Sequence, residues 1–168
     1  TLNHPRCPSA MRFRPASAAD AVLLADLFGA LVAAGEERLF HPHPLSAAAA
    51  REVCGHRTVA TDSPRDEYHV AVDPAATTTA VVGYGLLRGW SAGFAVPSLG
   101  IAVHPRARGR GLARTMMEHL HGIARARGAT RVRLKVYRDN IAAVRLYASL
   151  GYRLEPFDER QWLGLLDL

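Results

Sequence analysis

The sequence is nearly without lysine, which occurs only at Lys135, so arginine carries almost all of its basic charge. It also lacks any apolar run near the roughly 20 residues that a membrane span requires. Aromatic residues make up only 7% of the chain, but about half of all residues are apolar, which excludes a disordered polypeptide. The net charge of +6 is compatible with nucleic acid, an acidic surface or a phosphorylated small molecule as partner, and composition does not choose among them.

Cysteine is scarce as well, with only Cys7 and Cys54. A chain of 168 residues can bury a core without crosslinks, so we interpret both as free thiols in a reducing, cytoplasmic setting. Residues 1–10 (TLNHPRCPSA) lack a starting Met and the apolar stretch of a signal peptide. We expect them to be a disordered extension or a cloning remnant, and residues 11–168 to form a single domain.

Alternating and helical apolar patterns predict an α/β fold, with a mixed sheet covered by helices. The segments at 58–66 (TVATDSPRD) and 73–79 (DPAATTT) are expected to be a loop and a turn. The predicted strands are 11–15, 68–72, 80–88, 98–103, 131–136, 152–155 and 161–168. The predicted helices are 17–35, 46–57, 112–128 and 140–150.

Several residues are typical of helix ends. Ser17 is a suitable N-cap with Asp20 three residues later, and Ser46 is a suitable N-cap for the second helix. Gly35 and Gly151 follow apolar helical patterns and are expected to end them.

The stretch from Ser98 to Met117 (SLGIAVHPRARGRGLARTMM) combines a strand, a turn and a helix. Pro105 ends the strand because proline has no N–H for a ladder. Gly109 and Gly111 allow the backbone to approach a ligand closely, and the first N–H groups of the following helix attract an anion. The interleaved arginines add positive charge, so this stretch predicts a phosphate-binding site.

Arg106 to Gly111 (RARGRG) matches the acyl-CoA signature Q/R-x-x-G-x-G/A of the GNAT superfamily of N-acetyltransferases. About thirty residues later, VRLKVYRDNIAAVRLYASLGY resembles the second conserved part of that superfamily, with Asn140 and Tyr147 in register. The chain from Met11 to Leu168 therefore resembles a GNAT domain. The resemblance implies a mixed, mostly antiparallel sheet of about seven strands with about four helices.

The resemblance also implies acetyl-CoA as the cofactor. The N–H groups around the glycine turn would bind its pyrophosphate, and the strand before the turn would pair with its pantetheine arm. A strand N–H near Ile101 would polarise the thioester carbonyl. The residues implied in cofactor binding are Leu99, Ile101, Val103, Arg106, Arg108, Gly109, Arg110, Gly111, Leu112, Ala113, Asn140, Ala143 and Tyr147.

The implied reaction is direct attack of a neutral amine on the acetyl thioester in a ternary complex. Tyr147 occupies the position of the superfamily's tyrosine acid, and a phenol stays protonated at neutral pH. The predicted strand beside the thioester carries no carboxylate, so the general base is sought on the loop at 36–45. Glu37 and His43 are the predicted bases, and a water chain without a dedicated base is an equal alternative.

The acceptor is predicted from two segments, 36–45 and 88–97. The first (EERLFHPHPL), together with the longer stretch at 84–105 (YGLLRGWSAGFAVPSLGIAVHP), resembles GNAT members of sugar and polysaccharide biosynthesis. The amino group of a nucleotide-linked sugar is therefore the predicted acceptor. A protein N-terminus, a lysine or another small amine is the alternative, and a non-catalytic acyl-CoA sensor is a rival from a different class. The predicted acceptor-binding residues are Glu36, Phe40, His41, Arg88, Trp90 and Ser98.

The remaining histidines and basic residues are not predicted to act in catalysis. His41 and His43 make a poor zinc set without cysteine or a carboxylate pair, so no metal is expected. His119 and His121 are expected on the helix surface. Nucleic acid and membrane partners are not expected, and the apolar tail at 161–168 permits a homodimer. The basic residues expected on a solvated face, or at the cofactor's 3′-phosphate, are Arg125, Arg127, Arg131, Arg133 and Lys135.

Overall fold

The computed structural model describes residues 11–56, 64–74 and 80–168. The predicted extension at 1–10, most of the loop at 58–66 and most of the turn at 73–79 lie outside these residues. Within them, no helix combines the length and apolar character needed to cross a membrane.

Seven strands form one sheet in the order β1-β2-β3-β4-β5-β7-β6, as predicted for a mixed, mostly antiparallel α/β fold. All neighbouring strands are antiparallel except β4 and β5, which are parallel. The strands are β1 (Arg12–Pro15), β2 (Glu67–Asp73), β3 (Ala80–Arg88), β4 (Ser98–Val103), β5 (Arg131–Tyr137), β6 (Arg153–Pro156) and β7 (Gln161–Asp167).

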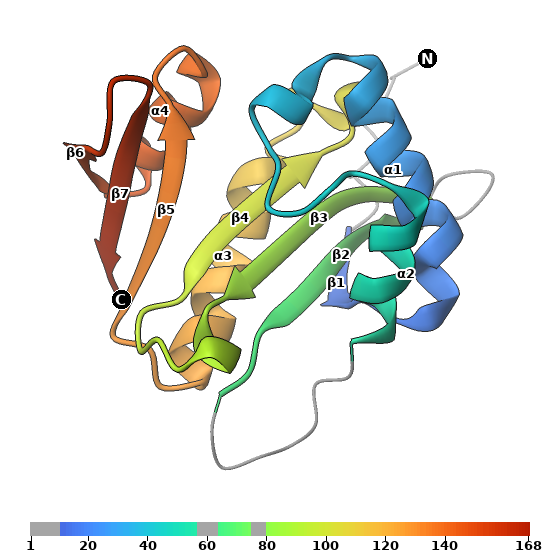
Figure 1. Cartoon of the computed structure of the whole chain (residues 1–168), viewed down its shortest axis with the longest axis horizontal. Helices are drawn as coiled ribbons and strands as arrows, with labels where there is room; N and C mark the ends of the chain where they lie inside the picture. Colours follow the sequence, from blue (N-terminus) through green and yellow to red (C-terminus); the bar gives the residue numbers. More distant parts are fainter. Residues whose placement is uncertain (1–10, 57–63, 75–79) are drawn as a thin grey trace, which may run out of the picture.

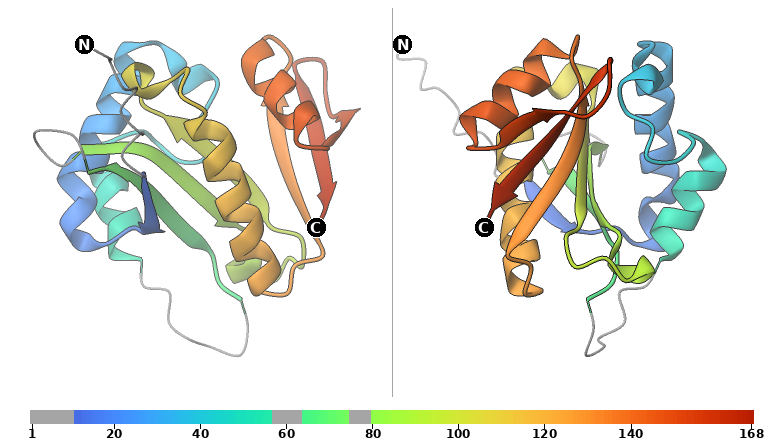
Figure 2. Two further views of the ribbon diagram at one scale, coloured as in Figure 1. Left: turned by 180° about the vertical axis from the view of Figure 1, so that it is seen from behind. Right: turned by 60° about the vertical axis from the view of Figure 1, so that its left-hand side comes forward.

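Four α-helices cover the two faces of the sheet (Figures 1 and 2). Helices α1 (Ala21–Ala33) and α2 (Ala47–Gly55) cover one face, and α3 (Leu112–Ala126) and α4 (Ile141–Ser149) cover the other. Short 3-10 helices, which the sequence did not predict, occupy Ala18–Asp20, Glu36–Arg38, Trp90–Ala92 and Pro105–Ala107.

The helix ends follow the local sequence. Ser17 and Asp20 form the predicted capping box, and the Ser46 hydroxyl accepts from the Ala49 N–H at 3.1 Å. Gly35 and Gly151 have φ of 70° and 91°, which an L side chain rarely adopts. These predictions are confirmed because each depends only on residues within one helical turn.

The core is divided by the sheet. Under α1 and α2, Phe28 and Tyr84 are fully buried among aliphatic side chains. Under α3 and α4, Met117, Val132 and Leu134 form the centre of a second cluster. Cys54, in the first cluster, is a free and buried thiol, whereas Cys7 lies outside the described residues.

Candidate active site

Strands β4 and β5 separate almost as soon as they meet. Ser98 and Arg133 are their single register pair, supported by the Arg133 N–H donating to the Pro97 carbonyl at 3.1 Å. Beyond that point β5 pairs along its length with β7, and Figure 1 shows β4 and β5 diverging. The free edge of β4 therefore borders a gap in the sheet.

The orientation of the β4 backbone shows which groups face this gap. The N–H of His104 donates to the Val82 carbonyl on β3 at 2.8 Å. Because backbone groups alternate in direction along a strand, Leu99, Ile101 and Val103 direct theirs away from β3 and toward the gap. These are the three strand residues predicted to pair with pantetheine, whose amides need backbone partners.

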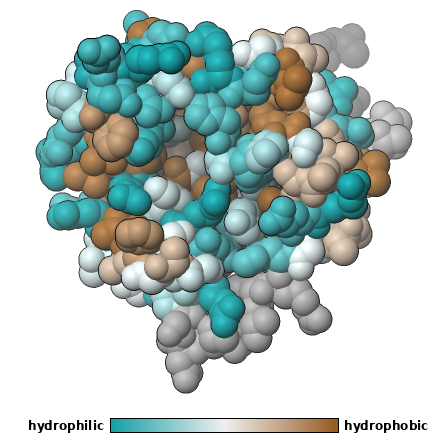
Figure 3. Space-filling model, in the orientation of Figure 1, coloured by the Kyte–Doolittle hydropathy of each residue, from teal (hydrophilic) through white to brown (hydrophobic). Residues whose placement is uncertain are grey.

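The gap opens into a cavity of about 520 Å³. In the space-filling view the face between the β5 side and the α1 side is hollowed, and hydrophilic side chains surround the hollow (Figure 3). Its lining residues are Leu31, Glu36, Leu39, Phe40, Leu99, Gly100, Ile101, Ala102, Val103, Ala107, Arg108, Gly109, Gly111, Leu112, Ala113, Arg114, Lys135, Val136, Asn140, Ala142, Ala143, Leu146 and Tyr147.

The glycine turn forms one end of the cavity. Gly109 and Gly111 have φ of 71° and 75°, and Gly111 is the N-cap of the fifteen-residue helix α3. Leu112 and Ala113, in the first turn of α3, also line the cavity. The free N–H groups and the positive end of the helix dipole thus face a space that fits a pyrophosphate.

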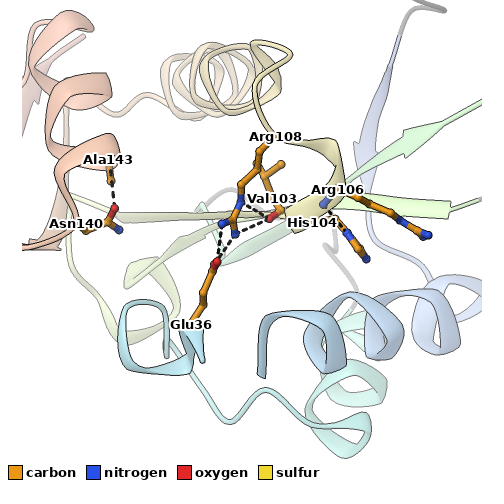
Figure 4. A network of polar contacts seen from close by, with 7 residues as sticks. All are labelled: Glu36, Val103, His104, Arg106, Arg108, Asn140 and Ala143. Atoms are coloured by element: carbon orange, nitrogen blue, oxygen red, sulfur yellow. Dashed lines mark hydrogen bonds and ion pairs between the residues drawn. The ribbon is translucent and has the colours of Figure 1, made fainter. Parts of the chain in front are cut away.

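Only one of the three predicted cofactor-binding arginines lines the cavity. Arg108 pairs with both carboxylate oxygens of Glu36, and it also donates to the Val103 carbonyl at 3.0 Å. Arg106 points away from this network (Figure 4), and Arg110 lies 3.9 Å from Asp73.

This placement favours an alignment of the signature that starts two residues later. The segment from Arg108 to Ala113 (RGRGLA) satisfies the pattern Q/R-x-x-G-x-G/A as well as the segment starting at Arg106 does. The short 3-10 helix Pro105–Ala107 turns Arg106 outward, whereas the segment starting at Arg108 leads directly into α3. The structure therefore favours the later register.

Tyr147 lies opposite the free edge of β4. Its side chain is 8% exposed, and burial raises the pKa of its phenol to about 12. Its hydroxyl has no hydrogen bond to another described residue, and Tyr147 lines the cavity. Asn140 caps α4 by accepting from the Ala143 N–H at 3.4 Å, which fixes the helix that carries Tyr147 (Figure 4).

The predicted bases are not brought to the cavity. Glu37 is exposed and does not line it. His43 lines a separate cavity of about 270 Å³, where one ring nitrogen lies 2.9 Å from the Tyr84 hydroxyl and the other 2.9 Å from the Pro44 carbonyl.

Some of the predicted acceptor residues line the large cavity and others do not. Glu36 and Phe40 line the large cavity, Arg88 lines the smaller one, and a ring nitrogen of His41 lies 2.8 Å from the Tyr137 hydroxyl. Trp90, by contrast, is only 6% exposed and packs in the core against residues under α3. Because burial removes its ring from solvent, the acceptor role predicted for Trp90 is corrected to core packing.

Two predictions for α3 are wrong. His121 is 5% exposed and its Nε2 lies 2.7 Å from the Tyr152 hydroxyl, and His119 is half-buried with its Nε2 3.0 Å from His69 Nδ1. Both rings face neighbouring elements because α3 is packed on the sheet along most of its length.

Arg127, predicted to lie on a solvated face or at the cofactor's 3′-phosphate, forms a 2.5 Å contact with the buried carboxylate of Glu67. Lys135, predicted in the same two roles, is exposed and also lines the cavity. The alternation of Val132, Leu134 and Val136 places Lys135 on the opposite face of β5, and this was the signal available in the sequence. Within the ranges that the structure describes, no cluster of three His, Cys, Asp or Glu suits a metal ion.

The splayed strands, the free backbone edge and the helix N-terminus together define an acetyl-CoA-dependent transferase. The model of the acetyltransferase (GNAT) family matches residues 33–152, so the chain belongs to the GNAT family. Acetyl-CoA is accordingly its acetyl donor, and the exposed edge of β4 and the start of α3 fit that molecule.

Solved structures share the fold. The GNAT domain of PAT from S. lividans aligns with a TM-score of 0.75 and 22% identity over 94% of this chain and 90% of that one. A GCN5-related N-acetyltransferase from Kribbella flavida aligns with a TM-score of 0.73 and 26% identity over 96% and 100%. A GNAT superfamily phosphinothricin acetyltransferase from Sinorhizobium meliloti, solved with acetyl-CoA, aligns with a TM-score of 0.71 and 20% identity over 94% and 88%. No curated protein matches the chain.

Proposed function

We propose that this N-acetyltransferase transfers the acetyl group directly to a small-molecule primary amine, with Tyr147 as the general acid. The observation that carries the proposal is that Tyr147 lines the same cavity as the free edge of β4 and its hydroxyl has no hydrogen bond to the described residues. The high pKa given by burial keeps this phenol protonated and able to donate.

The proposed step exchanges the carbon–sulfur bond of the thioester for a carbon–nitrogen bond. The neutral amine nitrogen forms a bond to the thioester carbonyl carbon while the N–H of Ile101 stabilises the carbonyl oxygen. The carbon–sulfur bond then breaks, and the departing thiolate takes the proton of Tyr147. The amine loses its proton to water, because neither Glu37 nor His43 lies on this cavity. Water then reprotonates the Tyr147 phenolate.

In a more specific form of the proposal, the acceptor is the amino group of a nucleotide-linked sugar. Arg88 offers a cation for the phosphates, but it lines the smaller cavity and donates to the Pro42 carbonyl at 2.5 Å. Trp90 no longer supports it, since its ring belongs to the core. Protein N-termini are the principal alternative and are included in the test.

The test measures release of CoA thiol from acetyl-CoA with a panel of small amines, UDP-linked and dTDP-linked amino sugars, and N-terminal peptides. The Tyr147→Phe variant should lose about 100-fold or more in kcat, the usual contribution of a general acid. Its matched control is Tyr152→Phe, which removes the hydroxyl of a neighbouring ring that contacts His121 rather than the cavity.

Full kcat in Tyr147→Phe would overturn the acid role. Turnover of peptides alone would overturn the small-molecule acceptor. Tight binding of acetyl-CoA without turnover of any amine would instead support the sensor alternative.

A further inference from the structure

Lys135 is the only lysine among the 168 residues, and it lies at the cavity of the acetyl donor. Its side chain is exposed, and it lines the large cavity together with the free edge of β4 and the start of α3. The ε-amine of lysine is a primary amine, the kind of group to which an N-acetyltransferase transfers its acetyl group. The fold thus brings an amine of the protein itself to the site where the donor binds.

The register of β4 and β5 determines where Lys135 lies along the gap. Ser98 and Arg133 are the single pair between these parallel strands, which diverge beyond it (Figure 1). Two residues further along each strand come Gly100 and Lys135, so these two residues lie at the same level on opposite sides of the gap. Both line the cavity. Ile101, whose N–H is proposed to stabilise the thioester oxygen, directly follows Gly100.

The side chain of Lys135 projects toward the acceptor side of the sheet. Its neighbours Leu134 and Val136 are buried in the cluster beneath α3 and α4. Because side chains alternate along a strand, Lys135 projects from the other face, toward α1 and the segment 36–45. Phe40 lines the cavity from that segment. The amine therefore lies on the side from which an acceptor is proposed to approach the thioester.

Only a weak contact holds this amine in the structure. Its Nζ lies 3.7 Å from the centre of the Phe157 ring, and it forms no hydrogen bond or ion pair with another described residue. Phe157 is 47% exposed, and a cation–π contact at such an exposed site is weak. Because lysine has a flexible four-carbon stem, the amine can leave the ring by rotation of its own side chain, with no change in the backbone.

The carboxylate of the cavity does not compete for this amine. Glu36 is the one acidic residue among the described residues that line the cavity, and both of its carboxylate oxygens accept from the Arg108 guanidinium. An amine that is held in an ion pair stays charged and cannot attack a thioester. Lys135 has no such pair, so its amine is able to lose a proton to water and react.

We propose that the enzyme acetylates its own Lys135 from bound acetyl-CoA. The neutral Nζ forms a bond to the thioester carbonyl carbon and loses its proton to water. The carbon–sulfur bond breaks, and the departing thiolate takes the proton of Tyr147, which water replaces. The products are Nε-acetyl-lysine at position 135 and CoA. The inference rests on the proposed function for the position of the thioester, and it goes beyond that function because the acceptor is the protein itself.

The experiment follows the mass of the intact enzyme during incubation with acetyl-CoA that carries an isotope-labelled acetyl group. The enzyme is first treated with a lysine deacetylase, so that Lys135 begins unmodified. The mass of one labelled acetyl group should appear, and peptide mapping should place it at Lys135. The rate constant should saturate with acetyl-CoA and stay the same when the enzyme is diluted. An excess of desulfo-CoA, an unreactive analogue of the donor, should suppress the reaction.

A double variant that moves the lysine provides the matched control. Lys135→Arg/Arg131→Lys keeps a single lysine on the same exposed face of β5, but about 13 Å along the strand and away from the cavity. The moved lysine should be acetylated about tenfold or more slowly, because it is no longer close to the bound donor. Lys135→Arg alone should gain no acetyl group on a lysine. Thermal unfolding of each variant checks that the compared proteins are folded.

Equal rates at the two lysine positions, a rate constant that rises with enzyme concentration, or a reaction that desulfo-CoA leaves unchanged would overturn the inference. The small-amine assay is run on the same samples. Turnover of added amines without labelling of Lys135 would overturn the inference and leave the proposed function intact. Saturable, desulfo-CoA-sensitive labelling of Lys135 without turnover of any added amine would support the inference and overturn the proposed small-molecule acceptor.

Discussion

Glu36 and Arg108 face each other across the mouth of the cavity, and each oxygen of the carboxylate accepts from one terminal nitrogen of the guanidinium. Glu36 belongs to the short helix after α1, whereas Arg108 precedes α3 and also donates to the Val103 carbonyl. The pair therefore joins the loop of the acceptor side to the phosphate-binding turn. The pair also occupies the Arg108 guanidinium, which is well placed to bind a pyrophosphate.

Replacing Glu36→Gln should tighten acetyl-CoA binding about two- to fivefold. The carboxylate competes with the pyrophosphate for Arg108, and a partly exposed ion pair of this kind contributes at most about 1 kcal/mol. Calorimetric titration with acetyl-CoA measures the dissociation constant, and Glu37→Gln, which removes an exposed carboxylate one residue away, serves as control. Weaker binding in Glu36→Gln would show that the pair instead organises the site.

Gly111→Ala should weaken acetyl-CoA binding several-fold and lower the free energy of unfolding by about 1 kcal/mol. The cause is the φ of 75° at this N-cap, which is unfavourable for an L side chain although no neighbouring atom blocks a Cβ. Gly122→Ala is the matched control in the middle of α3, where a Cβ also meets nothing. That variant should gain up to about 1 kcal/mol of stability with unchanged binding. Equal effects of the two substitutions would contradict the role of backbone conformation.

Stability should fall between pH 6.5 and 4 because of His121. Burial, with a smaller contribution from Arg125, lowers the pKa of this imidazole to about 4. The unfolded chain protonates the same group near pH 6.5, so below that pH the unfolded state binds more protons and is favoured. The stability that a neutral His121 contributes is thus present above pH 6.5 and lost as the pH falls toward 4.

Denaturant unfolding of wild type and His121→Gln across this range isolates the effect. Glutamine can still bond to the Tyr152 hydroxyl but does not titrate. The stability of wild type relative to the variant should fall by about 3 kcal/mol from pH 6.5 to 4. Parallel pH profiles for the two proteins would show that His121 titrates normally.

Removing Arg127 should destabilise the fold by about 2 kcal/mol. Glu67 is 2% exposed, and burial alone would raise its pKa, but hydrogen bonds from His69 and Arg127 outweigh burial and leave the pKa lowered. Arg127→Ala leaves this buried charge with fewer partners, which is costly. Arg125→Ala, an exposed neighbour on α3, should change stability by less than about 0.5 kcal/mol. Similar losses in both variants by chemical denaturation would contradict the buried pair.

The order of strands and helices was predicted from the sequence to within a few residues, because it rests on periodicity and on local stop signals. The glycine turn was also predicted, since strand, turn and helix are consecutive in the chain. The register of the signature was not, because RARGRG and RGRGLA both satisfy it. Only the outward direction of Arg106 and the inward direction of Arg108 distinguished them.

The sequence by itself determined the features that depend on residues within a few positions: the capping box at Ser17, the positive φ at Gly111 and the alternation along β5. The tertiary structure decided how the charged and polar side chains are used. Glu36 meets Arg108 across 72 positions, and Glu67 meets Arg127 across 60. Such pairs depend on which strands become neighbours and on where β4 separates from β5. No local sequence pattern specifies which residues far apart in the chain will meet.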